Sequence, residues 1–154
     1  MLKLRKNKKG FTLVELIVVI AIMAVLAGVV AGVTVSQLNK QTNKTGSAQA
    51  KTVADYISTV ALTGENDDDS TTTILDGDKF DKDKLSGLIT AQYSASSTQI
   101  TFVDSVTSPD AGKINVYFSD NTQQLVIVEF KEKGAGGTSI KYSVSYQGVV
   151  AKVA

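Results

Sequence analysis

The chain has 154 residues, enough for one domain or for a small domain with an appendage. Five of its 16 basic residues stand in the first nine positions, so the net charge of +1 combines a basic start with an acidic remainder. That remainder offers no basic surface suited to nucleic acid. The sequence contains no cysteine and no histidine, which excludes disulfides, cysteine metal sites and the commonest acid–base chemistry. We therefore expect no cofactor and no catalytic site.

The first element in chain order is the apolar stretch 11–35, whose only charged residue is Glu15. As a helix it would span about 37 Å, against about 30 Å for the hydrocarbon core of a bilayer, so it can cross a membrane with some tilt. The basic residues before it predict that the N-terminus stays in the cytoplasm and the remainder lies outside. A cleavable secretory signal is the competing interpretation. Such a signal is cut after a shorter apolar core, whereas the suitable residue here, Gly10, precedes the core.

The sequence MLKLRKNKKG followed by FTLVELIVVIAIMAVLA resembles the N-terminus of a type IV pilin or pseudopilin precursor. The family has a short basic leader that ends in glycine, then a phenylalanine, and a glutamate four residues further on. Gly10, Phe11 and Glu15 match these positions at the right spacing. The resemblance covers about residues 1–35. It implies cleavage between Gly10 and Phe11 by a prepilin peptidase, and N-methylation of Phe11 by the same enzyme.

The resemblance also implies the partners and the location of the chain. The precursor would pass through the secretion translocon and sit in the bacterial cytoplasmic membrane with a single pass. A membrane assembly platform would then stack many copies into a helical filament on the cell surface. The chain has no phosphate-binding glycine loop, so the ATPase that drives assembly must be another protein.

Glu15 is costly inside an apolar run, because an ionised group in a membrane costs about 3 kcal/mol even on lenient scales. Cleavage after Gly10 would create a cationic amine on Phe11, one helical turn from Glu15. The carboxylate can be met by the amine of its own chain or by that of an adjacent subunit, and the resemblance favours the second. We hypothesise that Glu15 guides subunit docking. The alternative is a first-turn helix acid in a signal anchor.

Gly28 and Gly32 have the G-x-x-x-G spacing that lets two membrane helices approach closely. Glycine also weakens a helix by about 1 kcal/mol relative to alanine. Many pilins carry a proline at the position of Gly32, so the place of any kink or melted stretch stays open. Close packing and flexibility are both expected roles of these two residues.

The helix should continue through residues 36–62 as an amphipathic second half and stop at Thr63-Gly64. Its apolar stripe should pack on a sheet and contains Val53, Tyr56, Ile57, Val60 and Ala61. The sequence Asn43-Lys44-Thr45 fits a glycosylation sequon, but this short motif is frequent by chance.

Residues 63–154 should form a globular α+β head. Its first part, 64–87, is acidic, with a run at Asp67–Asp69 and further aspartates at 76, 78, 81 and 83. The EF-hand pattern for calcium fails there, because the downstream glutamate is missing and the glycine is misplaced. We favour a solvated loop followed by a short helix capped by an aspartate. Phe80, Leu85, Leu88 and Ile89 should attach this segment to the core.

Beyond residue 97, apolar and polar residues alternate with a period of two in four stretches, 100–102, 114–118, 125–130 and 140–146. This alternation predicts four strands of an antiparallel meander with one buried face, on which the helix packs. Val126, Val128 and Phe130 share one face of the third strand, with Ile127 and Glu129 on the other. Two alternatives stay open for the last residues, 149–154: they extend the fourth strand or pair elsewhere.

Three functions compete. The first is a structural subunit, the major pilin of a type IV pilus, and the second is a pseudopilin of a type II secretion or competence system. The third is a membrane-anchored enzyme or binding protein. The third is disfavoured because no histidine is present to activate a serine and no Ser/Lys arrangement singles itself out.

Overall fold

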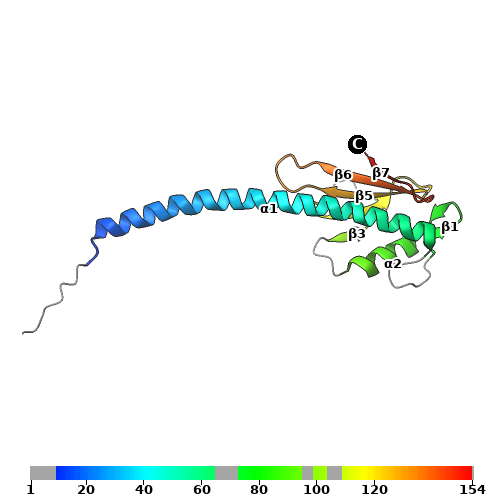
Figure 1. Ribbon diagram of the computed structural model, residues 1–154, viewed down its shortest axis with the longest axis horizontal. Helices are drawn as coiled ribbons and strands as arrows, with labels where there is room; N and C mark the ends of the chain where they lie inside the picture. The colour runs from blue at the N-terminus through cyan, green and yellow to red at the C-terminus, as the bar shows by residue number, and fades with distance from the viewer. Residues whose placement is uncertain (1–9, 65–72, 95–98, 104–108, 154) are drawn as a thin grey trace, which may run out of the picture. The chain divides into compact units, whose positions relative to one another are not determined.

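A computed structural model describes residues 10–64, 73–94, 99–103 and 109–153 of the chain. It divides into two compact units, residues 1–37 and residues 38–154, and we call the second the globular unit. Helix α1 (Leu13–Thr63) runs through both (Figure 1). The chain thus consists of an N-terminal unit and a globular unit linked by one continuous helix.

Helix α1 ends where the sequence predicted. Gly64 has a φ of +70°, a conformation that glycine adopts without steric cost, and its N–H donates to the carbonyl oxygen of Val60 at 2.9 Å. The polar stretch after residue 35 remains helical even though it contains Gly46. The predicted continuation of the helix to residue 62 is confirmed.

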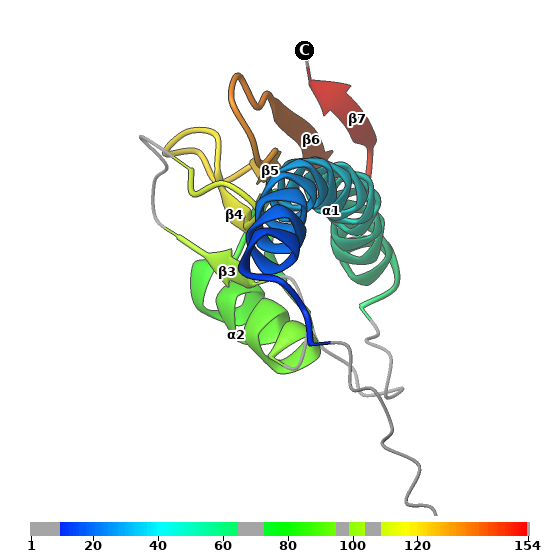
Figure 2. The ribbon, with the colours of Figure 1, turned by 90° about the vertical axis from the view of Figure 1, so that its left-hand side faces the viewer.

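The globular unit contains two sheets and a second helix. A small antiparallel hairpin pairs β1 (Leu75–Asp76) with β2 (Lys79–Phe80), and helix α2 (Lys82–Tyr93) follows. The larger sheet has five strands in the order of the chain: β3 (Ile100–Phe102), β4 (Ile114–Phe118), β5 (Leu125–Lys131), β6 (Ser139–Ser145) and β7 (Val150–Val153). Figure 2 shows this sheet curving around α1, with α2 beside β3. The predicted α+β class, a long helix packed on a mostly antiparallel sheet, is confirmed.

The sheet differs from the predicted four-stranded meander in two ways. Strand β3 pairs in parallel with β4, from Ile100 opposite Ile114 to Phe102 opposite Val116. The connection of residues 103–113 is long enough to return the chain to the starting end of the sheet, which a tight hairpin cannot do. The final residues form a fifth strand, β7, which pairs antiparallel with β6 and has no strand on its outer side in the described part of the chain.

Segment 64–87 also holds structure that its loop-like composition did not predict. The β1–β2 hairpin has only two paired residues on each side, too few for alternation to be visible in the sequence. Its turn is made possible by Gly77, whose φ is +62°. The predicted short helix with an aspartate cap is confirmed as α2, with Asp81 as its N-cap.

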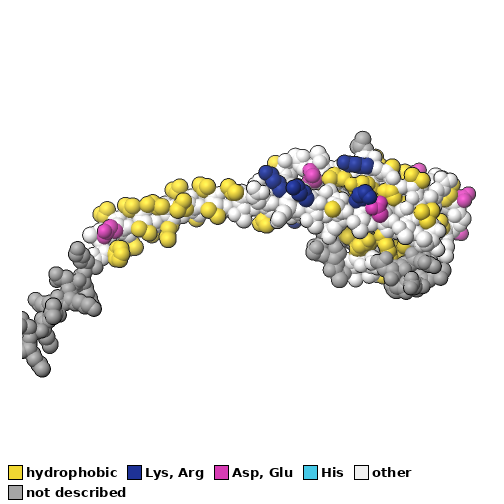
Figure 3. Space-filling view, in the orientation of Figure 1, with side chains coloured by type: hydrophobic (Ala, Val, Ile, Leu, Met, Phe, Trp, Pro, Cys, Tyr) yellow, Lys and Arg dark blue, Asp and Glu magenta, His cyan; other side chains and the backbone are white. Residues whose placement is uncertain are grey.

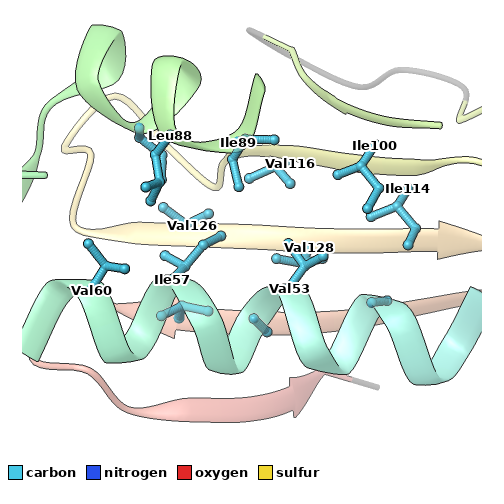
Figure 4. Packing of buried hydrophobic residues seen from close by; sticks show 14 of the residues in the cluster. Val53, Ile57, Val60, Leu88, Ile89, Ile100, Ile114, Val116, Val126 and Val128 are labelled. Carbon is cyan, nitrogen blue, oxygen red and sulfur yellow. The ribbon is translucent and has the colours of Figure 1, made fainter. Parts of the chain in front are cut away.

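The core lies between α1, α2 and the inner face of the larger sheet. Val53, Ile57 and Val60 point from α1 toward Val126 and Val128 of β5 (Figure 4). The predicted stripe of α1 and the predicted inner face of β5 are therefore confirmed. The four residues expected to attach the acidic segment are also buried: Phe80, Leu85, Leu88 and Ile89.

The outer face of the sheet contains a buried acid. Glu129 is only 3% exposed, and its carboxylate accepts a hydrogen bond from the hydroxyl of Tyr117 at 2.8 Å. The Nζ atom of Lys141 lies 3.7 Å from the other carboxylate oxygen. Burial, reinforced by the bond to Glu129, raises the pKa of Tyr117 well above its usual range. Two neighbouring strands thus supply the partners that a buried carboxylate requires.

Helix α1 lies close against Phe130 of β5 at Gly46. This residue is buried, and a Cβ atom built on it would collide with the aromatic ring of Phe130. The ring is fully buried and so cannot move aside. Glycine at position 46 therefore permits the close approach of helix and sheet.

We predict that Gly46→Ala lowers the free energy of unfolding of the globular unit by about 1–3 kcal/mol, because overpacking at Phe130 outweighs the gain in helix propensity. The measurement is thermal unfolding of the full chain in detergent, followed by near-ultraviolet circular dichroism of the tyrosines. Gly87→Ala is the matched control, since a Cβ atom in the middle of α2 meets nothing within 4 Å. It should stabilise by about 0.5–1 kcal/mol. Equal effects of the two variants would contradict the proposed role of Gly46.

Candidate functional site

The predicted cleavage site lies just before the first turn of α1. Gly10 and Phe11 are outside the helix, and the side chain of Phe11 is 90% exposed. The peptide bond between them therefore belongs to a non-helical segment that another protein can reach. Cleavage of this bond is not tested by the structure and stays a prediction.

The first turn of α1 is closed by Thr12 and Glu15. The backbone N–H and the hydroxyl of Thr12 donate to Oε2 of Glu15 at 2.8 Å and 2.9 Å. The backbone N–H of Glu15 in turn lies 3.3 Å from the hydroxyl oxygen of Thr12, which accepts from it. This reciprocal arrangement is a capping box, which satisfies two N–H groups that a helix start leaves without partners. The sequence signal was a threonine three residues before a glutamate, and the sequence analysis missed Thr12.

The capping box orients Glu15 toward the cleavage site. Its carboxylate is held at the backbone N–H of Thr12, the residue that directly follows Phe11. Glu15 therefore points back along the helix, toward the place where cleavage would create the amine of Phe11. In the uncut chain, Thr12 satisfies part of the hydrogen-bonding capacity of the carboxylate.

Between Leu13 and Val35 the surface of α1 is apolar on every side, and Glu15 is the one charged residue in this part of the helix. The large apolar side chains from Leu13 to Val35 are 48–73% exposed, and the yellow surface along this part of α1 in Figure 3 shows them. Helix α1 contains an 18-residue window with a mean hydropathy of 3.0, of which no part is buried. Its length and composition allow it to cross a membrane. An apolar surface of this kind indicates contact with lipid or with other chains.

Gly28 and Gly32 lie inside this apolar part of α1. The helix continues unbroken through both, and a Cβ atom at either position would meet nothing within 4 Å. The single chain thus leaves open space at the two glycines. Their roles in close packing or in flexibility remain predictions.

Residues 5–31 match the family model of the prokaryotic N-terminal methylation motif. The chain carries the leader signature of type IV pilins and pseudopilins. The match includes Gly10, Phe11, Glu15 and Gly28, and it ends before the globular unit. No curated protein and no solved structure shows significant similarity to the chain. The methylation motif therefore identifies the N-terminal segment, and the globular unit has to be interpreted from its own structure.

The residues around the sequon have a structural role. The side-chain amide of Asn43 donates to the carbonyl oxygen of Lys133 at 3.0 Å, and its oxygen accepts from the N–H of Lys133 at 2.7 Å. Asn43 thereby joins α1 to the connection between β5 and β6. Because both the nitrogen and the oxygen of its side-chain amide are hydrogen-bonded to Lys133, Asn43 acts as a clamp within the globular unit.

The aspartates of the acidic segment stabilise local structure. Asp81 caps α2 by accepting from the backbone N–H groups of Asp83 at 3.0 Å and Lys84 at 3.1 Å. Asp76 forms an exposed ion pair with Lys79 at 3.7 Å. No group of three or more potential metal ligands was found among the residues that the structure describes. The predicted run Asp67–Asp69 lies outside those residues.

We predict that Thr12→Val loosens the first turn of α1, because valine keeps the shape of threonine but lacks the capping hydroxyl. Loss of a capping side chain corresponds to about fivefold faster amide exchange. The measurement is hydrogen exchange of the Glu15 amide by NMR, with the full chain in detergent micelles. Thr12→Ser keeps the hydroxyl and should exchange at the unchanged rate. Equal exchange in both variants would contradict the capping box.

We predict that Asn43→Ala lowers the free energy of unfolding of the globular unit by about 1–3 kcal/mol, because two hydrogen bonds to Lys133 are lost. Thr45→Ala is the matched control, since it destroys the sequon without touching the clamp. It should leave stability and mass unchanged. If both variants instead lost the same mass and the same stability, Asn43 would act through a glycan rather than as a clamp.

Proposed function

We propose that the protein is the major pilin of a type IV pilus, cut by a prepilin peptidase and polymerised through the apolar part of α1. The observation that carries this proposal is the methylation motif at residues 5–31, next to a helical surface that is exposed and apolar from Leu13 to Val35. The motif supports a pilin-like or pseudopilin structural subunit rather than an enzyme.

Two residues would carry the assembly chemistry. Hydrolysis of the bond between Gly10 and Phe11 releases the leader and leaves an amine on Phe11, which takes up a proton and becomes cationic. The same peptidase then methylates this amine. The carboxylate of Glu15 in a neighbouring copy neutralises the amine, which offsets the cost of placing both charges among apolar helices. The pair also fixes the register of the two helices, as one buried polar pair does in coiled coils.

The proposed path follows from the chemistry of the N-terminal unit. The precursor is inserted by the secretion translocon and held in the cytoplasmic membrane by α1, with the leader on the cytoplasmic side. Subunits then move from lipid into a filament, where the same apolar surface contacts other copies of α1. An assembly platform and an ATPase elsewhere in the cell drive this transfer, and the filament lies on the cell surface.

A pseudopilin of a type II secretion or competence system is the second candidate, because the methylation motif is shared by both groups. The single five-stranded sheet of the globular unit, with its strands in chain order, favours a major pilin. Isolation of long surface fibres composed of this chain would support the first candidate. Fibres confined to the cell envelope would support the second.

Glu15→Gln separates the two roles of Glu15. Glutamine can still accept from Thr12 in a capping box but carries no charge. We predict that this variant is cut to a chain that starts at methylated Phe11, yet yields fewer sheared fibres by about tenfold or more. Mass spectrometry of the membrane fraction and of the sheared material provides the measurement.

Thr12→Val is the control for the Glu15 experiment, since it removes the cap and keeps the charge. It should assemble into fibres. Normal fibre yield from Glu15→Gln would refute charge pairing, and an intact Met1 terminus in the membrane would refute processing.

A further inference from the structure

The globular unit carries a basic cluster at one end, which the net negative charge of the chain beyond the leader did not predict, because the fold gathers lysines that are far apart in the sequence. Ala111 forms an isolated β-bridge with Lys131, and the backbone N–H of Gly112 donates to the carbonyl oxygen of Lys131 at 2.7 Å, which brings the neighbouring Lys113 to the same end. The Asn43–Lys133 clamp brings this part of the sheet to the start of α1 in the unit. We define the basic end by its five lysines: Lys40, Lys44, Lys113, Lys131 and Lys133.

Most of this positive charge is not neutralised by an ion pair with any residue that the structure describes. Lys113 pairs with Asp110 at 2.8 Å, and this contact lowers the pKa of Asp110. The Glu132 carboxylate at this end accepts a hydrogen bond from the hydroxyl of Thr138 at 2.9 Å. The other four lysines have no carboxylate within 4.0 Å in the described ranges, and each is wholly or partly exposed. The basic end therefore presents a charged surface on which four of the five lysines have no ion-pair partner among the described residues.

The opposite end of the globular unit is acidic on balance, because its described aspartates outnumber its lysines: Asp76, Asp78, Asp81, Asp83 and Asp120 against Lys79, Lys82 and Lys84. The N–H of Phe80 donates to the carbonyl oxygen of Gln123 at 2.9 Å, which joins the β1–β2 hairpin to the connection between β4 and β5. Helix α2 begins directly after this hairpin. We define the acidic end by three exposed aspartates that form no ion pair with any described residue: Asp78, Asp83 and Asp120.

The two ends lie at opposite extremes of the second half of α1. Asn43 contacts the basic end, whereas Leu62 packs near Gly148, in the turn between β6 and β7. The N–H of Tyr146, which precedes this turn, donates to Gln124 beside the acidic end at 3.0 Å. Figure 3 shows dark blue side chains where α1 enters the globular unit and magenta side chains at the far end. The charge of the globular unit therefore differs between its two ends: the end near residue 40 is positive, and the end near residue 63 is negative.

We propose that the basic end of one globular unit contacts the acidic end of the globular unit of another copy. The inference rests on the proposed function and adds a second interface to it. The two surfaces differ, so a two-fold dimer would not use both, whereas repeated head-to-tail contact satisfies every copy and gives an open filament. Complementary charge contributes mainly to the rate of association and to the register.

A second copy explains both charged surfaces, which is why we prefer it to a membrane surface. Anionic lipid headgroups would attract the basic end alone, and they would repel the acidic end. Only a partner with both signs of charge, arranged end to end, uses both sets of side chains. Another copy of this chain has that arrangement.

A charge-swap experiment on the full chain tests the contact, with sheared fibres quantified against processed chain in the membrane. Lys133→Glu and Asp78→Lys should each reduce the fibre yield, by about threefold for one exposed pair. The double variant Lys133→Glu with Asp78→Lys should restore the yield, because the two ends then attract again. Lys152→Glu is the control, since it changes the net charge equally on β7, away from both ends, and should leave the yield unchanged.

Three results would overturn the inference. One is unchanged yield in both single variants. Another is loss in Lys133→Glu that Asp78→Lys does not repair, which would point to anionic lipid instead. The third is an equal loss in Lys152→Glu, which would show an effect of net charge alone. Normal amounts of processed chain in the membrane confirm folding of each variant. Absence of fibres from the unchanged chain would refute the proposed function itself, so the two failures are separable.

Discussion

The main physical constraint on this protein is the exposed apolar surface of α1 between Leu13 and Val35. Between Leu13 and Val35, α1 exposes large apolar side chains on every side, and burial of such area is worth about 25 cal/mol per Å². Lipid and neighbouring helices are the two environments that remove this surface from water. The proposed membrane precursor and the proposed filament subunit would therefore each remove the same surface from water. Glu15 gains its importance from being the single charge within this surface.

The capping box holds the carboxylate of Glu15 in a defined orientation before any subunit docks. In the uncut chain the carboxylate is hydrogen-bonded to Thr12, so the helix start is well formed while Phe11 is still joined to Gly10. The proposed cleavage would create a cation at Phe11, one residue before Thr12. The proposed pair with a neighbouring copy then uses a carboxylate that is already oriented. A pre-ordered group binds at a smaller entropic cost than a free one.

Features governed by local sequence were predictable, and features governed by distant contacts were not. The end of α1, the buried stripe through Ile57 and the cap at Asp81 follow from spacing within a few residues of each other. The parallel pairing of β3 depends on the path of an eleven-residue connection that carries no periodic signal. The burial of Glu129 depends on Tyr117 and Lys141 in two other strands.

The candidate site shows the same division. Gly10, Phe11 and Glu15 were found because the methylation motif is a local pattern of residues at fixed spacing, which can be recognised in the sequence without the fold. Thr12 was missed although its capping spacing was present. The clamp between Asn43 and Lys133 joins residues 90 positions apart, so no local pattern announces it. A sequon match at Asn43 was the only local feature, and it pointed to a modification instead of a contact.

Strand β7 has a consequence for a densely packed fibre. Its outer edge carries backbone groups that could pair with a strand of a neighbour, and such pairing would fuse adjacent sheets irreversibly. The strand is only four residues long and includes the exposed Lys152, two features that discourage edge-to-edge association. Copies crowded side by side would then remain individual bodies, and a polymer built from them could be taken apart and its subunits used again.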